Sequence, residues 1–378
     1  MSESLTWIEI NQKALLDNFR QFRRRVGKKT KIMAVVKANA YGHGIGEVAR
    51  IIAPRVDWLG VNRFEEGIFL RQAGINQPVL ILGYTPLVSL KEIIKNNLSF
   101  VAYNQKTFTR ANQEAEKLGK LAKIHLKLET GTNRQGVDIK AALSLAQSSR
   151  REKGLELEGL YTHYANIEDT LDPSFAQEQL RKFKEAEKLL QKEGVKIPFK
   201  HTACTAATIL FQETYFNLIR LGIGLYGLWP SRETKVSAQE KEIKINLKPV
   251  LTWKTKVAQV KEIGKGETVG YGRTFTTRRR TKMAILLVGY WDGYDRKLSN
   301  SSRALVKGYS APVVGRICMN MMIVDITEIP RVKPEDEVVL LGKQDREEIT
   351  AEEMAQKIGT INYEVVTRIN PLILRKVV

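Results

Sequence analysis

Residues 122–163, AKIHLKLETGTNRQGVDIKAALSLAQSSRREKGLELEGLYTH, contain one complete strand–helix–strand unit, and this unit decides the fold class. Ala122–Leu128 and Glu158–His163 are short runs typical of strands, and Ile139–Lys153 between them has the spacing of an amphipathic helix. A strand that is followed by a helix and then by a second strand favours parallel pairing of the two strands.

The same alternation recurs on both sides of this unit. Further strands are predicted at Ile32–Lys37, Val56–Val61, Pro78–Leu82, Phe100–Tyr103, Pro198–Thr202 and Leu218–Leu221. Further helices are predicted at Gln12–Val26, Arg63–Ala73, Gln105–Leu118 and Pro173–Lys192. About eight repeats over roughly 220 residues favour a closed (β/α)8 barrel, with an open doubly wound sheet as the alternative.

The pattern changes after Pro230. The polar segment SRETKVSAQEKEIKINLKP reads as a connector, and a mostly-β domain with one helix follows it. Its expected elements are strands at Val250–Val260, Met283–Val288, Ala304–Lys307, Val313–Met319, Met322–Ile326 and Glu337–Leu341, and a helix at Ala351–Ile358. A strand at Leu5–Ile10 precedes the barrel and could pair into this second domain. We therefore expect a barrel domain at 11–235 and a mostly-β domain formed by 1–10 and 236–378.

The composition is that of a globular protein with a basic surface. The 378 residues include 61 Lys and Arg against 41 Asp and Glu, a formal net charge of +20. Acids interleave with the bases at helical spacing and no nucleic-acid-binding motif accompanies them, so we expect no nucleic-acid partner. No apolar run of about 18 residues predicts a membrane helix, and no secretory signal is present. Two cysteines without a CxxC motif predict neither a disulfide framework nor a zinc site. We expect a cytoplasmic protein.

Reactive residue types follow the predicted strands, at the end of a barrel where active sites lie. Lys37 closes the first apolar strand, where loss of solvent lowers a lysine pKa and suits a Schiff base with a carbonyl cofactor. A lysine that reaches solvent at a strand end is the structural alternative. The glycines of the following ANAYGHG segment favour the functional reading, because they let the backbone approach a ligand closely.

A second candidate site lies after the last two barrel strands. The segment RLGIGLYG, from Arg220 to Gly227, contains a formal GxGxxG, but Pro230 argues against the helix that a dinucleotide fold needs. A phosphate cradle of backbone amides fits this position better. Thr205 could add a hydroxyl to it or serve as a helix N-cap. His163 also ends a strand, whereas His125 and His201 are assigned to the core. The histidines and acids form no metal-binding spacing.

Together these residues resemble bacterial alanine racemases, which are pyridoxal-phosphate enzymes built from a barrel and a β domain. The resemblance runs from WIEIN at Trp7 to INYEV near the C-terminus, and AVVKANAYGHG is its most specific motif. It implies that Lys37 is the Schiff-base lysine and the base on one face of the substrate. Tyr271, in VGYGRTF, would be the opposing base, supplied by the partner subunit of a homodimer. Racemisation needs two such bases, because the proton leaves one face and returns to the other.

The resemblance also implies supporting roles. Arg220 would face the pyridine nitrogen, and His163 would link Arg220 towards Tyr271. Arg134 would contact the cofactor's phenolic oxygen and the substrate carboxylate, which the Met319 backbone amide would also meet. Lys127 matches a lysine that is carbamylated in some members. The phosphate would be held by Tyr41, Thr205, Gly222, Ile223 and Tyr363.

The expected function is interconversion of L- and D-alanine, which supplies D-alanine for peptidoglycan. Two residues depart from the family pattern: Cys204 stands where asparagine is usual, and Asn320 where aspartate is usual. Both departures bear on which amino acid the enzyme prefers as substrate. Tyr363 is expected to crowd bulky substrate side chains and so to favour alanine. The alternatives are a serine or broad-specificity racemase of the same fold, a non-catalytic pyridoxal-phosphate-binding protein, and a decarboxylase.

Overall fold

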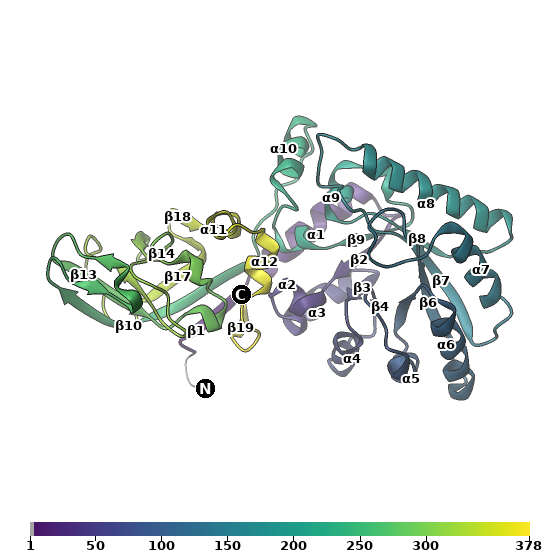
Figure 1. The fold of residues 1–378 in the computed structure, drawn as a ribbon, viewed down its shortest axis with the longest axis horizontal. Helices are drawn as coiled ribbons and strands as arrows, with labels where there is room; N and C mark the ends of the chain where they lie inside the picture. The colour runs from purple at the N-terminus through teal and green to yellow at the C-terminus, as the bar shows by residue number, and fades with distance from the viewer. Residues whose placement is uncertain (1–3) are drawn as a thin grey trace. The chain divides into compact units, whose positions relative to one another are not determined.

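The computed structural model describes residues 4–378. Their backbone contacts separate two parts, shown in Figure 1. The barrel unit contains residues 16–38 and 48–248. The β unit contains residues 39–47 and 249–378, together with the N-terminal segment up to residue 15.

Eight parallel strands form the barrel unit's sheet, in the order β8-β7-β6-β5-β4-β3-β2-β9. The backbone amide of Arg220 in β9 donates to the carbonyl of Ala203, just after β8, at 2.9 Å. The first and last strands of the order therefore meet, which confirms the predicted barrel over the open sheet. The strands are β2 Lys31–Val35, β3 Trp58–Val61, β4 Val79–Ile81, β5 Ser99–Ala102, β6 Ala122–Lys127, β7 Leu155–Tyr161, β8 Phe199–His201 and β9 Leu218–Leu221.

Helices lie on the outside of these strands, as α4 to α8 show in Figure 1. The predicted bounds of α1 and α6 are confirmed. The helices are α1 Gln12–Val26, α2 Lys37–Tyr41, α3 Ile45–Ile52, α4 Phe64–Gln72, α5 Leu90–Lys95, α6 Gln105–Leu118, α7 Ile139–Ser149, α8 Ser174–Lys192, α9 Thr205–Leu210 and α10 Arg232–Glu240.

Helix α10 corrects the expectation of a connector after Pro230. Ser231 caps it, since its hydroxyl accepts from the Thr234 amide at 3.0 Å. The helix has few apolar side chains, so it lacks the apolar periodicity that reveals most helices in a sequence. Its N-cap serine is the local signal that was available.

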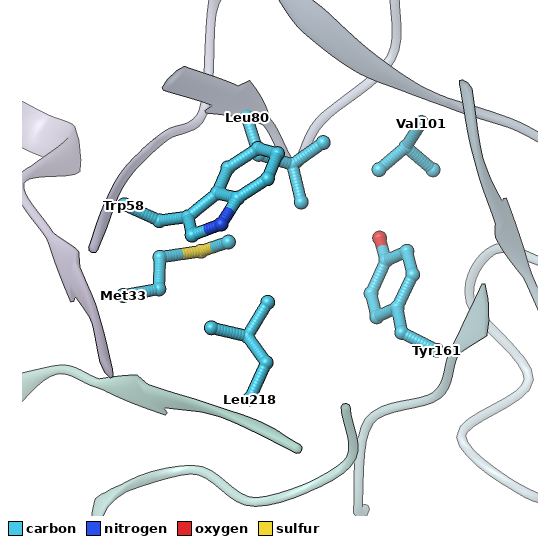
Figure 2. Close-up of a cluster of buried hydrophobic side chains, with 6 residues drawn as sticks. All are labelled: Met33, Trp58, Leu80, Val101, Tyr161 and Leu218. Atoms are coloured by element: carbon cyan, nitrogen blue, oxygen red, sulfur yellow. The ribbon is translucent and has the colours of Figure 1, made fainter. Parts of the chain in front are cut away.

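The barrel interior is filled by side chains from strands that are distant in sequence. Figure 2 shows Met33, Trp58, Leu80, Val101, Tyr161 and Leu218, which come from six of the eight strands and are at most 3% exposed. Alternate residues of a strand face opposite sides, so one set packs inside the barrel while the other faces the helices. The interior is therefore a packed core.

The β unit is built on a nine-stranded sheet whose main path is β15-β14-β17-β10-β1-β19. The N-terminal strand β1 pairs antiparallel with β10, with Ile8 opposite Trp253, which confirms the expected pairing into the second domain. The unit contains β1 Thr6–Ile10, β10 Leu251–Ile263, β11 Thr268–Val269, β12 Phe275–Thr276, β13 Thr281–Leu286, β14 Arg303–Val306, β15 Tyr309–Pro312, β16 Met322–Asp325, β17 Glu337–Gln344, β18 Glu347–Ile349, α11 Ala351–Ile358, α12 Asn362–Thr367 and β19 Leu374–Val377.

One predicted strand of this unit is wrong. Val313–Met319 makes a single isolated bridge, between Val313 and Val324, and no strand. Gly315 has φ of +77°, a left-handed conformation that turns the chain out of an extended path.

Candidate active site

The sequence predicts that Lys37 is the last residue of the first barrel strand. In the structure Lys37 lies after β2 and is the first residue of α2. The four residues after it, Ala38 to Tyr41, have φ between +52° and +53°, so they form a left-handed turn. Each L-residue in such a turn costs roughly 1–2 kcal/mol, and strained backbone of this kind clusters at functional sites. The turn is stabilised locally: the Asn39 side chain accepts from the Ile45 amide at 2.9 Å.

The surroundings of Lys37 favour its neutral form. Burial lowers its pKa, and the positive charges of Arg134 and Arg220 lower it further against the opposing effect of Glu66. A larger neutral fraction makes the amine a better nucleophile and a better base at neutral pH. The alternative, a lysine whose amine simply reaches solvent, does not account for a pKa that is lowered by burial.

Arg220 is held at the end of β9 by acceptors from neighbouring strands. Its Nη1 donates to Nδ1 and to the carbonyl of His201, at 2.7 and 2.9 Å. Its Nη2 donates to the carbonyls of Thr162 and Thr202, both at 2.8 Å, and approaches Nδ1 of His163 at 3.3 Å. Nε–H is therefore the one N–H group of the Arg220 side chain that has no hydrogen-bond partner among residues 4–378. An arginine held this rigidly offers one donor in one direction.

His163 lies beside this guanidinium and has a pKa well below its usual value. Burial is the main cause, and the nearby charge of Arg220 adds to it. The imidazole is therefore neutral at physiological pH and accepts a hydrogen bond from Arg220.

Lys127 and Arg134 lie at the end of β6 and in the loop that follows it. Lys127 is buried, and burial together with Arg134 and Arg220 lowers its pKa to about 8. Its Nζ donates to Oε1 of Gln135 at 3.3 Å. Arg134 is exposed, and its backbone is fixed because its amide donates to the Glu129 carboxylate at 3.2 Å. Two further cationic groups thus occupy the end of the barrel that holds Lys37.

Thr205 and the segment after β9 form a tight backbone cradle. The Thr205 hydroxyl is buried and accepts from the amides of Gly222 and Gly224, at 3.1 and 3.4 Å. A Cβ added to Gly224 would lie 2.5 Å from the Thr205 methyl group, so only glycine fits there. Ile223 is fully buried between these glycines. The Thr205 hydroxyl accepts from both amides and still has its own proton to donate, so this cradle of small residues can present that proton to an anion.

Four predicted site residues belong to the β unit. Tyr41 and Tyr363 lie together, with ring centroids 6.1 Å apart. Tyr271 and Met319 are 71% and 55% exposed. These two side chains are open to a ligand or to another protein chain.

Cys204 precedes α9 in the barrel unit. Burial raises the pKa of its thiol to about 11, so the thiol stays protonated and is a weak nucleophile at neutral pH. Its place in the chain is beside Thr205, but its chemistry is that of a small packing residue.

Sequence reasoning missed the part that His201 and His125 play. Both are fully buried, as expected for core residues, yet His201 binds Arg220 directly and His125 binds His201. No local signal in the sequence indicates this contact, because β6 and β8 are separated by β7 in the barrel order. In the part of the chain that the structure describes, no cluster of His, Cys, Asp or Glu could hold a metal, and no helix is long and apolar enough to cross a membrane.

Comparison with known proteins gives consistent results over the whole chain. The family model for the alanine racemase N-terminal domain matches residues 10–230, and that for the C-terminal domain matches residues 250–377. Alanine racemase 2 of Caldanaerobacter subterraneus subsp. tengcongensis is 40% identical over 95% of this chain and 91% of its own length.

Solved structures give the same result. Alanine racemase of Clostridium difficile has a TM-score of 0.94 and 33% identity, over 100% of this chain and 97% of the other. A histidine racemase of Leuconostoc mesenteroides has a TM-score of 0.90 and 25% identity, over 100% and 99% of the two chains. The family and the enzyme class predicted from the sequence, an amino-acid isomerase, are thereby confirmed: the chain belongs to the alanine racemase family.

Proposed function

We propose that the chain interconverts L- and D-alanine with pyridoxal phosphate bound at the carboxyl end of the barrel. The observation that carries this proposal is that Lys37, whose pKa is lowered, lies within the electrostatic influence of the rigidly held guanidinium of Arg220. Lysine at the end of a barrel strand supplies a reactive amine, and arginine supplies a fixed donor that does not give up its proton.

The residues present fit this cofactor. The cradle of Thr205, Gly222 and Ile223 would hold its phosphate, and Tyr41 and Tyr363 are proposed as further phosphate ligands. The remaining Nε–H of Arg220 would meet the pyridine nitrogen, and Arg134 the phenolic oxygen. When bound, the cofactor supplies an aldehyde that condenses with amines and a ring that stabilises negative charge at the substrate α-carbon.

The chain's own residues would move the proton. Lys37, favoured in its neutral form, takes or returns the α-proton on one face. Tyr271 would do the same on the other face, and His163 would link Arg220 towards the Tyr271 hydroxyl. Arg220 stays protonated and does not pass its proton to the ring, which disfavours side reactions that need a fully neutralised ring. Arg134 and the backbone amide of Met319 would hold the substrate carboxylate.

A homodimer is part of this proposal. Tyr271 sits in a short turn whose Gly272 packs against the Arg316 side chain, and the same unit carries a patch of exposed apolar residues. The amide of Trp291 donates to the carbonyl of Met319 at 3.0 Å, so the two segments of the patch lie side by side. Exposed apolar patches of this kind mark interaction surfaces. The patch comprises Tyr290, Trp291, Met319 and Met321.

A subunit-mixing experiment tests the shared site. Lys37→Ala and Tyr271→Phe variants, each inactive alone, should regain about a quarter of wild-type activity when denatured and refolded together, because half of the dimers carry one intact site. No recovery would mean that Tyr271 does not act on the partner's Lys37.

Lys127 is proposed as a carbamylation site. Its pKa of about 8 leaves an appreciable neutral fraction, and the neutral amine is the form that adds carbon dioxide. We further propose a cytoplasmic enzyme whose D-alanine enters peptidoglycan.

Alanine specificity is tested by chiral chromatography. Loaded enzyme is incubated separately with L-alanine, L-serine and L-histidine, and D-alanine should be the dominant product. The second candidate is a racemase of wider specificity, which the histidine racemase likeness and the variants at Cys204 and Asn320 favour. Dominant D-serine or D-histidine would establish it, and bound cofactor with no D-product would leave a non-catalytic protein or another reaction, such as decarboxylation.

A further inference from the structure

A file of hydrogen-bonded side chains runs from Arg220 into the barrel interior. After the contact between Arg220 and Nδ1 of His201, Nε2 of His201 lies 2.8 Å from Nδ1 of His125. Nε2 of His125 lies 3.2 Å from Oε2 of Glu158, which also accepts from the Ser99 hydroxyl at 2.5 Å. All five residues are at most 7% exposed. The file joins five strands of the barrel.

The chemistry of the end groups fixes every proton in the file. Arginine only donates, so Nδ1 of His201 is an acceptor and its ring proton is on Nε2. That proton is donated to Nδ1 of His125, which places the His125 proton on Nε2. Nε2–H of His125 then donates to the Glu158 carboxylate, which only accepts. The hydrogen bonds therefore run in one direction, from the cation to the anion, through two neutral imidazoles.

The barrel is built around these rings. A Cβ at Gly159 would lie 2.1 Å from Nδ1 of His125, so glycine there makes room for the imidazole. The Tyr161 ring stacks on His201 with centroids 4.8 Å apart and planes 6° apart, and Trp58 meets His125 edge-on at 5.4 Å. Figure 2 shows Trp58 and Tyr161 pointing into the same interior.

Glu158 supplies the negative charge that is connected to Arg220 through His125 and His201. The side-chain and backbone acceptors that touch Arg220 directly are imidazoles and carbonyls, none of which carries a negative charge. Burial alone would raise the pKa of Glu158. The hydrogen bonds from His125 and Ser99 and the positive charge of Lys123 together outweigh burial, so the pKa is lowered. Glu158 is therefore ionised at neutral pH.

We propose that Glu158 and His125 are positioning residues that act on Arg220 through His201. The buried carboxylate polarises the file, holds Nδ1 of His201 as an acceptor, and so fixes the direction in which Arg220 presents Nε–H. This role for the reaction rests on the proposed function, whereas the file itself does not.

Histidine NMR of the cofactor-free protein tests the file directly. With 15N-labelled histidine, His125 and His201 should both be neutral at pH 7 with the proton on Nε2. His43, in the β unit, serves as an internal reference among the four histidines. A proton on Nδ1 of either ring, or a doubly protonated His201, would overturn the proposal.

The Glu158→Gln variant tests the charge, because it keeps the size and an acceptor. The Hε2 signal of His125 should move upfield, and so should that of His201, which Glu158 does not touch. Glu156→Gln, an equal charge change on the same strand, should move neither. An unchanged His201 signal in Glu158→Gln would refute the transmission. If that variant does not fold, Ser99→Ala tests the same transmission: loss of the Ser99 donor leaves the Glu158 carboxylate a stronger acceptor, so both Hε2 signals should move downfield, and unchanged signals would refute the proposal equally.

The loaded enzyme supplies the second readout. Glu158→Gln should lower kcat about tenfold with KM nearly unchanged, the lower end of the effect seen when a carboxylate that orients a metal-bound histidine is removed. An unchanged kcat alongside shifted histidine signals would sink the positioning role. Because the NMR experiment needs no cofactor, its outcome is independent of whether the protein racemises alanine.

Discussion

Gly159→Ala should displace the His125 ring from its hydrogen bonds. The new Cβ would lie 2.1 Å from Nδ1 and 2.5 Å from Cε1 of His125, far inside the roughly 3.5 Å of an ordinary contact. The ring has little room to retreat, because Trp58 lies against it and both nitrogens are hydrogen-bonded. The substitution must therefore move the ring, the strand or both.

The cost follows from these contacts. Overpacking a core costs about 1–3 kcal/mol, and a buried polar group that loses its partner costs about 1–3 kcal/mol. With His201 and Glu158 both affected, we expect the free energy of unfolding to fall by roughly 3–9 kcal/mol. This is a large share of the roughly 5–15 kcal/mol that stabilises a typical protein.

Chemical denaturation followed by circular dichroism measures this loss, and a double-mutant cycle identifies its cause. In a His125→Ala background the space is free, so Gly159→Ala should there cost less than about 1 kcal/mol. A cost below about 1 kcal/mol in the wild-type background, or equal costs in both, would show that the ring is not what requires glycine.

Three further predictions concern the left-handed turn, the buried histidines and the cofactor lysine. Ala38 is exposed with φ of +53°, so Ala38→Gly should stabilise the protein by about 1 kcal/mol in urea unfolding, whereas Ala141→Gly in the ordinary helix α7 should destabilise it; a loss at both would contradict the turn. Burial lowers the pKa of His43 to about 4 and those of His163 and His201 well below 6.5, so only their unfolded forms gain protons below pH 6.5. Stability should therefore fall as pH drops from 6.5 towards 4, by up to about 1.4 kcal/mol per unit for each histidine, and a flat unfolding midpoint from pH 7.5 to 5 would rule this out. Lys37→Ala should abolish the borohydride-reducible link to pyridoxal phosphate without lowering the thermal midpoint of the cofactor-free protein; a reducible adduct at another lysine would refute the assignment.

The sequence alone determined the barrel strands and their order. Local periodicity predicted all eight barrel strands, and closure followed because repeated strand–helix units have few compact solutions. The same reasoning placed Lys37, Thr205 and Arg220 at strand ends. It failed where a local signal was weak: α10 has few apolar side chains, and Gly315 turns a run that otherwise looks like a strand.

Only the tertiary structure decided which buried polar groups meet. His125 and His201 are 76 residues apart, and nothing near either one indicates that they share a hydrogen bond. That contact depends on the register of β6, β7 and β8 and on the space left by Gly159. The left-handed turn after Lys37 is likewise not readable from ANAY, since those residue types prefer right-handed or extended backbone. Periodicity encodes which face of an element is buried, whereas the partners of a buried charge are set by how the closed barrel aligns its strands.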